Sequence, residues 1–393
     1  MSGYTKHIFM KDLRKINSDL TRFVKSIIPL LPYSYNFDTI NLLLKRFYPY
    51  ELFIINEKYE YYCSKERYLQ AVGKKSRFKM ATPSNLIRKL PIYKKITTSE
   101  YIQQHQKNYD EITQKEEENK LAITRNPKIK KICDKIKKSK AKAQQVEPAF
   151  LDALMGLYDR KNTTQKDKVY IFVELQKYFC SKTIRFFYKK IDTEYNRQLR
   201  EMACKHLQSL GFQPKLGRQK YIRIPSRNKK RREYLKNTYA YESYAIQGIP
   251  EELEYRLENS KEQRIKSYDF FISHSSTDYA EVQSLLEYLN RDGKNVYCDW
   301  IADKDYLKRQ LLGKETLAVI KKRIQQSNAV IFVVSDKSVS SNWCKYELNY
   351  AHGLGKCIYA IPKDHILNCN FEYNKVIDTW FIDPAYEDLA LWE

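Results

Sequence analysis

Short runs of β-branched and aromatic residues alternate with helical periods between positions 268 and 383. The segments that separate these runs, at 279–289, 314–326 and 340–354, have the periodicity of helices. Continuous apolar strands with helices between them are typical of a parallel sheet that is covered on both faces. We therefore predict a flavodoxin-like α/β fold here, with strands YDFFIS (268–273), NVYCDW (295–300), AVIFVVS (329–335), CIYAIP (357–362) and TWFID (379–383).

Polar residues stand at the ends of the predicted strands. SHSSTD (273–278) follows the first strand, Asp299-Trp300 close the second, and Ser335-Asp336 follow the third. Ligands bind at the carboxyl ends of the strands in open parallel sheets. The helix at 340–354 adds Trp343 and Glu347, which share one helix face because they are four residues apart. The sequence thus predicts a cleft that is lined by an indole and a carboxylate.

Four blocks of this region resemble the Toll/interleukin-1 receptor (TIR) domain of the bacterial kind, and they follow the family order: YDFFISHSSTD, VYCDW, AVIFVVSDKSVSS and NWCKYEL. The resemblance covers residues 263–393 and is to effectors of antiphage defence that cleave NAD⁺. It implies that Glu347 of the W-x-x-x-E helix is catalytic and that NAD⁺ is the substrate. It also implies self-association of TIR domains, no further cofactor and no metal. The substrate contacts that it implies are Phe271, Ser273, His274, Asp299, Trp300 and Trp343.

The implied chemistry suits a carboxylate. Loss of nicotinamide from NAD⁺ leaves an oxocarbenium-like ribose, which a neighbouring carboxylate stabilises. Aromatic faces such as Trp343 and Phe271 can stack on the departing ring. Three other interpretations stay open. The Trp343–Glu347 pair can be a core anchor beside a solvated charge. The TIR domain can be a signalling scaffold without activity, or the chain can be a regulator that binds nucleic acid.

Charge divides the chain into two parts of different character. Residues 261–393 hold 17 Lys and Arg against 19 Asp and Glu, whereas residues 1–260 hold 54 against 28. A codon bias acts on the whole gene and does not produce such a division. The basic surplus favours a polyanionic partner for residues 1–260, such as DNA, RNA, a nucleotide messenger or an acidic protein surface. A solvated basic face is the alternative interpretation.

Residues 212–236 have the outline of a winged or ribbon-type nucleic-acid reader. A helix that ends at Gly211 is followed by a possible hairpin (212–225) and by the run RNKKRREYLK (227–236). Tyr221 is able to stack on a base. The predicted nucleic-acid or partner contacts are Arg218, Lys220, Arg223, Arg227, Lys229, Lys230, Arg231 and Arg232.

The remaining sequence indicates a mainly helical region. We predict an amphipathic helix over 9–27, a second helix at 38–47, a β-like run at 52–63 and a helix over 192–210. Apolar residues thin out over 98–142, which indicates a solvated helix or a mobile connector. We expect three parts: a helical region of no recognised family (1–125), a basic helical and hairpin region (126–262) and the TIR-like part (263–393).

Nothing in the sequence indicates a membrane segment or a secretory signal. No apolar run approaches the ~18 residues that a membrane helix needs, and the N-terminus lacks the pattern of a signal peptide. The eight cysteines never approach CxxC spacing, so neither a disulfide framework nor a zinc knuckle is suggested. We expect a cytoplasmic protein with reduced thiols and no membrane contact.

Overall fold

The computed structural model describes residues 4–217, 219, 222, 224, 226–307 and 313–376. The chain divides into two compact units, one of Met1–Lys137 with Gly211–Gln213 and one of Lys138–Leu210 with Pro214–Glu393. Within the described residues, no helix is long and apolar enough to cross a membrane. The boundaries expected at 125/126 and 262/263 fall inside helices, and the three-part division stays a prediction.

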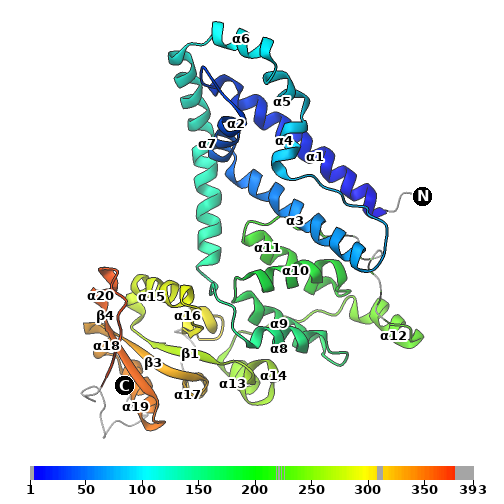
Figure 1. Ribbon diagram of the computed structural model, residues 1–393. Helices are drawn as coiled ribbons and strands as arrows, with labels where there is room; N and C mark the ends of the chain where they lie inside the picture. Colours follow the sequence, from blue (N-terminus) through cyan, green and yellow to red (C-terminus); the bar gives the residue numbers. More distant parts are fainter. Residues whose placement is uncertain are drawn as a thin grey trace. The chain divides into compact units, whose positions relative to one another are not determined.

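The first unit consists of helices around an apolar core (Figure 1). The predicted amphipathic helix is confirmed, since Phe9, Ile16, Leu20 and Phe23 are buried along it. The helix predicted at 38–47 is confirmed as well. The helices are α1 (Tyr4–Ile27), η1 (Ile28–Leu30), α2 (Phe37–Phe47), α3 (Pro49–Ala71), α4 (Pro83–Lys89), α5 (Pro91–Ile96), α6 (Ser99–Lys107) and α7 (Glu111–Lys140).

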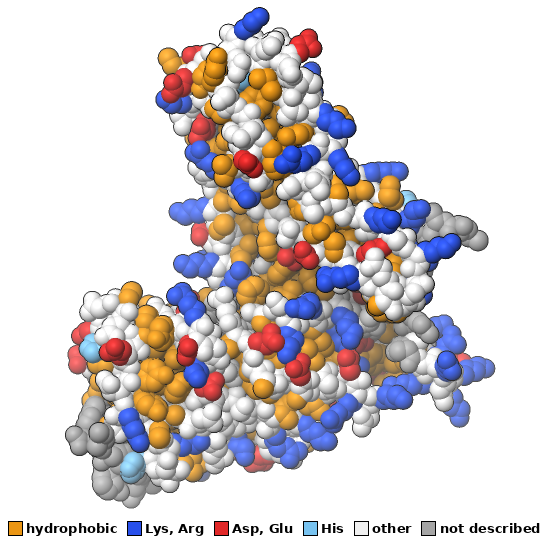
Figure 2. All heavy atoms as spheres, in the orientation of Figure 1, with side chains coloured by type: hydrophobic (Ala, Val, Ile, Leu, Met, Phe, Trp, Pro, Cys, Tyr) orange, Lys and Arg blue, Asp and Glu red, His pale blue; other side chains and the backbone are white. Residues whose placement is uncertain are grey.

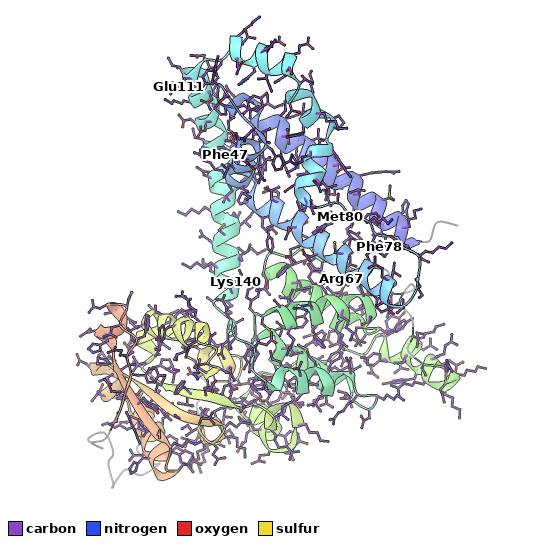
Figure 3. The ribbon with its side chains drawn as sticks, in the orientation of Figure 1. Phe47, Arg67, Phe78, Met80, Glu111 and Lys140 are labelled. Carbon is purple, nitrogen blue, oxygen red and sulfur yellow. The ribbon has the colours of Figure 1, made fainter. Side chains whose placement is uncertain are left out.

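The β-like run predicted at 52–63 is wrong, because these residues lie inside α3. Ile55, Tyr62 and Leu69 are buried at seven-residue intervals, a spacing of about two helical turns. The β-propensity of Ile and Tyr is therefore overridden by packing on one helix face. Figure 3 labels Phe78 on the segment that follows α3, and its ring centroid lies 5.8 Å from that of Tyr62.

The charged stretch at 98–142 contains α6 and α7, which confirms the solvated helix. The 30 residues of α7, whose ends are labelled in Figure 3, include no buried side chain. Arg125 fastens this helix to the first unit. Its Nε donates a hydrogen bond of 2.8 Å to the Phe47 carbonyl, and its Nη2 pairs with Glu51.

The second unit begins with helices. The helix predicted over 192–210 is confirmed, but it begins only at Arg197, because Asn196 caps it by accepting a hydrogen bond from the Leu199 N–H. Most of the predicted hairpin at 212–225 lies outside the described residues, and the described residues 212–217 form no strand. The helices are α8 (Phe150–Asp159), α9 (Gln165–Gln176), α10 (Ser181–Thr193), α11 (Arg197–Ser209), α12 (Lys229–Tyr234), η3 (Leu235–Tyr239), α13 (Pro250–Asn259) and α14 (Lys261–Arg264).

The rest of the second unit is a five-stranded sheet with the order β2-β1-β3-β4-β5. The strands β1 to β4 pair in parallel, as predicted, and β5 pairs antiparallel with β4. Apolar clusters lie on both faces of this sheet. The strands are β1 (Tyr268–Ser273), β2 (Val296–Tyr297), β3 (Ser327–Val334), β4 (Cys357–Pro362) and β5 (Asn374–Lys375).

Between the strands lie η4 (Ser276–Asp278), α15 (Tyr279–Arg291), α16 (Asp299–Ala302), α17 (Lys314–Gln325), α18 (Asp336–Val339), α19 (Asn342–Gly353) and α20 (Lys363–Leu367). The second strand is shorter than predicted, because Asp299 and Trp300 begin α16. The strand predicted at 379–383 lies outside the described residues.

The helical part of the second unit covers the β2 edge of the sheet. The Gln144 side chain accepts a hydrogen bond of 3.0 Å from the Val296 N–H and donates one of 2.7 Å to the Val296 carbonyl. One side-chain amide thus pairs with the N–H and the carbonyl of an edge-strand residue, as the backbone of a neighbouring strand would. Leu253 and Leu257 of α13 also pack with Val319 of α17. Residues before the TIR-like part therefore contribute to its packing.

Candidate active site

Ser273 and Glu347 meet at the carboxyl end of β1. Ser273, which is fully buried, is the last residue of that strand. Its Oγ donates a hydrogen bond of 2.6 Å to Glu347 Oε2, which comes from α19. The predicted catalytic residue and one predicted substrate contact are thus in direct contact, at the edge where ligands of parallel sheets bind.

Burial raises the pKa of Glu347 to about 8. The Ser273 hydrogen bond opposes this shift, and the neighbouring Asp299 charge adds to it. Burial thus favours the protonated form of this carboxyl in the free protein. A carboxyl with so shifted a pKa, at the ends of parallel strands, is a candidate functional group.

His274, Cys298 and Asp299 lie beside this pair. Their nitrogen, sulfur and oxygen atoms are all within 4.8 Å of one another. His274 Nδ1 lies 3.2 Å from the Ile272 carbonyl oxygen, a contact that fixes the imidazole on its own loop. Cys298 is fully buried, whereas about half of the Asp299 side chain is exposed. Cysteine spacing gave no sign of this cluster, since the fold brings its members together from two strand ends.

A second set of polar contacts braces the loop after β1. Asp278 accepts hydrogen bonds from Ser335 Oγ at 2.6 Å and from Lys363 Nζ at 2.9 Å. Burial alone would raise the pKa of Asp278, but these two partners lower it. The brace joins the ends of β1, β3 and β4. Sequence analysis placed Asp278 and Ser335 at strand ends without assigning them roles, and it missed Lys363.

The aromatic residues of the predicted site separate into two groups. Trp343 is partly buried against the core, and the Trp300 ring centroid lies 4.5 Å from that of the exposed Tyr279. Phe271 is instead a core residue: it is 2% exposed and stacks on Tyr297 at 5.1 Å. We therefore correct its predicted role in stacking on nicotinamide, because its ring is buried in the core and packs against Tyr297.

Buried charges fix the loop after β2. Asp303 accepts hydrogen bonds of 2.8 and 3.1 Å from Arg323 of α17, and Lys177 Nζ lies 3.6 Å away. Glu174 of α9 accepts a hydrogen bond of 2.7 Å from Lys266. Burial would raise the pKa of both carboxyls. The surrounding cations outweigh it, holding the pKa of Asp303 far below its usual value and that of Glu174 at about 2. We call these five residues the charge network.

The charge network was missed by sequence analysis, although it connects the helical part to the candidate site. Asp303 follows α16, the helix that begins at Asp299. Gln263 extends the network, since its amide oxygen accepts from Arg323 Nη2 at 2.9 Å and its amide nitrogen donates to Glu174 at 2.9 Å. The loop after β2 is therefore held by groups from outside the TIR-like part as well as inside it.

The described members of the predicted basic site are exposed, and they lie on or beside the short helix α12. Figure 2 shows Lys and Arg side chains gathered over this helix. Arg231 donates a hydrogen bond of 3.0 Å to the Lys161 carbonyl. The described members are Arg227, Lys229, Lys230, Arg231 and Arg232, whereas Arg218, Lys220 and Arg223 lie outside the described residues. Their role in binding a partner stays a prediction.

Comparisons with known proteins agree with the resemblance of this region to TIR domains. A family model described as TIR domain matches residues 270–365. The chain is 36% identical over 362 residues to a candidate cyclic ADP-D-ribose synthase, TIR2 of Cytobacillus dafuensis, and the match covers 92% of each chain. It is 36% identical over 97 residues to the candidate 3′ cyclic ADP-D-ribose synthase ThsB′ of Bacillus cereus (strain MSX-D12), or 25% of this chain and 50% of that one. Toll-like receptor 2 of Equus caballus is 36% identical over 94 residues, 23% of this chain and 11% of the receptor. No solved structure gives a significant match.

Proposed function

The chain belongs to the bacterial TIR-domain family, with TIR2 as a relative over nearly its whole length, and on this premise we propose that it cleaves the nicotinamide–ribose bond of NAD⁺. The Ser273–Glu347 hydrogen bond is the observation that carries the proposal, because it holds a half-buried carboxyl of raised pKa at the strand ends. The names of TIR2 and ThsB′, which describe both as candidate cyclic ADP-D-ribose synthases, support it.

In the proposed reaction, Glu347 stabilises the positive charge that develops on the ribose. The bond from C1′ to the nicotinamide nitrogen breaks, and nicotinamide leaves with the electron pair as a neutral molecule. The remaining oxocarbenium-like ribose is best stabilised by the ionised carboxylate. The cationic nicotinamide ring of bound NAD⁺ also favours that ionised form, because an opposite charge lowers the pKa of a carboxyl. Ser273 orients the carboxylate through its hydrogen bond.

We extend the proposal to the product. In a cyclase, a nucleophile of the same ADP-ribose attacks C1′ and loses a proton, whereas in a hydrolase water does so. The two relatives named as synthases of cyclic ADP-D-ribose favour the cyclic product. Chromatography of the products separates the two outcomes. Since NAD⁺ is the substrate, neither reaction requires a resident cofactor.

The substitution Glu347→Gln tests the enzyme against the scaffold. It removes the charge at nearly constant volume, so we expect nicotinamide release to fall by about 10²–10³-fold or more. The matched control is Glu372→Gln, which makes the same change at an exposed residue. Turnover that survives Glu347→Gln would exclude the proposed mechanism. The protein would be a scaffold if the wild type never released nicotinamide and the Glu347→Gln variant kept the protein's function in cells.

The rest of the chain supports a regulated effector. We propose that residues 1–260 bind a polyanionic partner, that TIR domains then associate, and that the consumption of NAD⁺ serves antiphage defence. The basic surplus of residues 1–260 and the resemblance to defence effectors support this extension. A plaque assay tests it. Cells that carry the wild type should resist phage, and cells that carry Glu347→Gln should not.

A further inference from the structure

The cluster of His274, Cys298 and Asp299 has the composition of a metal site. It combines an imidazole, a thiol and a carboxylate, and the three donor atoms lie within 4.8 Å of one another. His274 Nε2 is 3.8 Å from Asp299 Oδ1, and Cys298 Sγ is 4.0 Å from that same oxygen. These three side chains are the only group of this kind in the part of the chain that the structure describes.

The orientation of His274 suits a metal ligand. Its Nδ1–H donates to the Ile272 carbonyl at 3.2 Å, which selects the tautomer whose Nε2 carries a free lone pair. That Nε2 is the atom that faces Asp299. Histidine ligands of metals usually donate their other ring N–H to a carbonyl or carboxylate in this way. Backbone geometry, which is independent of the cluster itself, therefore prepares the imidazole for coordination.

We propose that His274, Cys298 and Asp299 bind a thiophilic divalent cation, Zn²⁺, at the edge of the candidate active site. Ligand atoms of a tetrahedral zinc site lie about 3.4–3.6 Å apart, given zinc–ligand distances of about 2.0–2.3 Å. The two distances to Asp299 exceed this range by less than about half an ångström. Asp299 Oδ1 accepts a hydrogen bond of 2.8 Å from the Trp300 N–H, and its half-exposed side chain closes the difference by turning from that N–H toward the metal. The Cys298 thiol releases its proton to solvent when the metal binds. The thiolate and the carboxylate then balance the two positive charges, and a fourth position is left for water.

Metal binding at this place regulates the enzyme. Asp299 is one of the charges that shift the pKa of Glu347, so the cluster lies within electrostatic reach of that carboxyl. Two of its ligands, His274 and Asp299, are also predicted substrate contacts. A bound Zn²⁺ therefore removes both from the substrate and inhibits NAD⁺ cleavage reversibly. This regulatory half of the inference rests on the proposed function, whereas the binding half does not.

Binding is tested on the full chain after treatment with a chelator. Zn²⁺ is titrated against a chromophoric chelator, and Co²⁺ is added separately as a spectroscopic probe. We expect one equivalent of Zn²⁺ and a thiolate-to-Co²⁺ charge-transfer band. Cys298→Ser should abolish the band and weaken Zn²⁺ binding by at least about tenfold. Cys369→Ser, a matched change at an exposed cysteine, should alter neither. A band that persists in Cys298→Ser, or no band in the wild type, would overturn the site.

His274→Ala provides a second variant in case Cys298→Ser does not fold. It should keep the thiolate band but bind Zn²⁺ more weakly, whereas unchanged affinity would exclude His274 as a ligand. In the activity arm, Zn²⁺ should inhibit NAD⁺ cleavage by the wild type and by Cys369→Ser, with recovery after chelation. Equal inhibition of Cys298→Ser would overturn the regulatory role. If the metal-free protein does not cleave NAD⁺ even when its TIR domains are forced to cluster, the proposed function fails, and the Co²⁺ band still decides the metal site.

Discussion

Glu347 sets the expected pH dependence of the site. The groups around it are the Ser273 hydroxyl, the Asp299 carboxylate and the thiols of Cys298 and Cys344. Because the ionised carboxylate is the form that stabilises a cationic ribose, and burial raises its pKa to about 8, kcat/KM for NAD⁺ should rise with pH. The rise should approach tenfold per unit well below pH 8 and level off above it.

The measurement is the initial rate of nicotinamide release at low NAD⁺, from about pH 6 to pH 9, in buffers that contain a chelator. Raising the pH should not restore the activity of Glu347→Gln, since an amide does not titrate in this range. A wild-type kcat/KM that stays constant across this range would show that Glu347 is already ionised at neutral pH.

At the scale of single residues, Glu347 and Ser273 were predicted because both belong to recognisable blocks. The fold brings them into contact, and their roles stay predictions. The predicted role of Phe271 was wrong, because side chains point alternately to the two faces of a strand and both faces of this one are covered. The sequence does not show which of the two faces meets a ligand. The cluster of His274, Cys298 and Asp299 escaped it for another reason. Metal ligands brought together by two strand ends leave no short spacing to recognise.

At the scale of elements, the charge network should be a large contributor to the stability of the second unit. Asp303→Asn leaves the buried Arg323 and Lys266 and the half-buried Lys177 with Glu174 as their only remaining carboxylate in the network. Breaking a buried ion pair typically costs about 3–5 kcal/mol, because an uncompensated charge stays buried. We expect a loss of that order in the free energy of unfolding.

Urea unfolding of the full chain, followed by circular dichroism, measures this loss. The matched control is Asp305→Asn, which removes the same charge from an exposed position two residues along the same loop. It should shift the free energy by no more than about 0.5 kcal/mol. If Asp303→Asn behaved like Asp305→Asn, the network would be solvated in solution and would not hold the loop.

The elements themselves were predicted with uneven success for physical reasons. Strands β1, β3 and β4 are continuous apolar runs, which few other structures accommodate, and they were predicted nearly to their ends. The residues of α3 have high β-propensity, and only tertiary packing decides in favour of a helix. The charge network could not be predicted, since its members look like ordinary solvated charges until the fold buries them.

At the scale of the whole molecule, residues that precede the TIR-like part share buried contacts with it. Charge composition alone indicated a division near residue 260, because composition reports on surfaces. The contacts of Gln144 with Val296 and of Glu174 with Lys266 are buried inside the second unit, so charge composition does not reveal them. A partner that binds the helical part can therefore act on the loop after β2 through side chains that are already in contact.

The exposed cations at α12 are the predicted contact surface for that partner. If the exposed cations at α12 contact the phosphates of a nucleic acid, the affinity of the full chain should fall steeply with salt. Each phosphate contact contributes about 0.9 to the slope of log affinity against log salt for duplex DNA. Replacing Arg227, Lys229, Lys230, Arg231 and Arg232 with Gln should therefore lower the slope by as much as about 4–5.

Fluorescence anisotropy with duplex DNA, single-stranded DNA and RNA, from about 50 to 200 mM salt, measures this slope. The control variant replaces five exposed lysines of α7 with Gln and so has the same net charge: Lys128, Lys130, Lys131, Lys135 and Lys137. A smaller slope in the α12 variant alone assigns the contact to that helix, whereas a smaller slope in the control alone moves the binding surface to α7. Equal losses in both would mean that affinity follows net charge without a localised site. Binding at α12 that also changes the rate of NAD⁺ cleavage would connect the basic surface to the catalytic carboxyl.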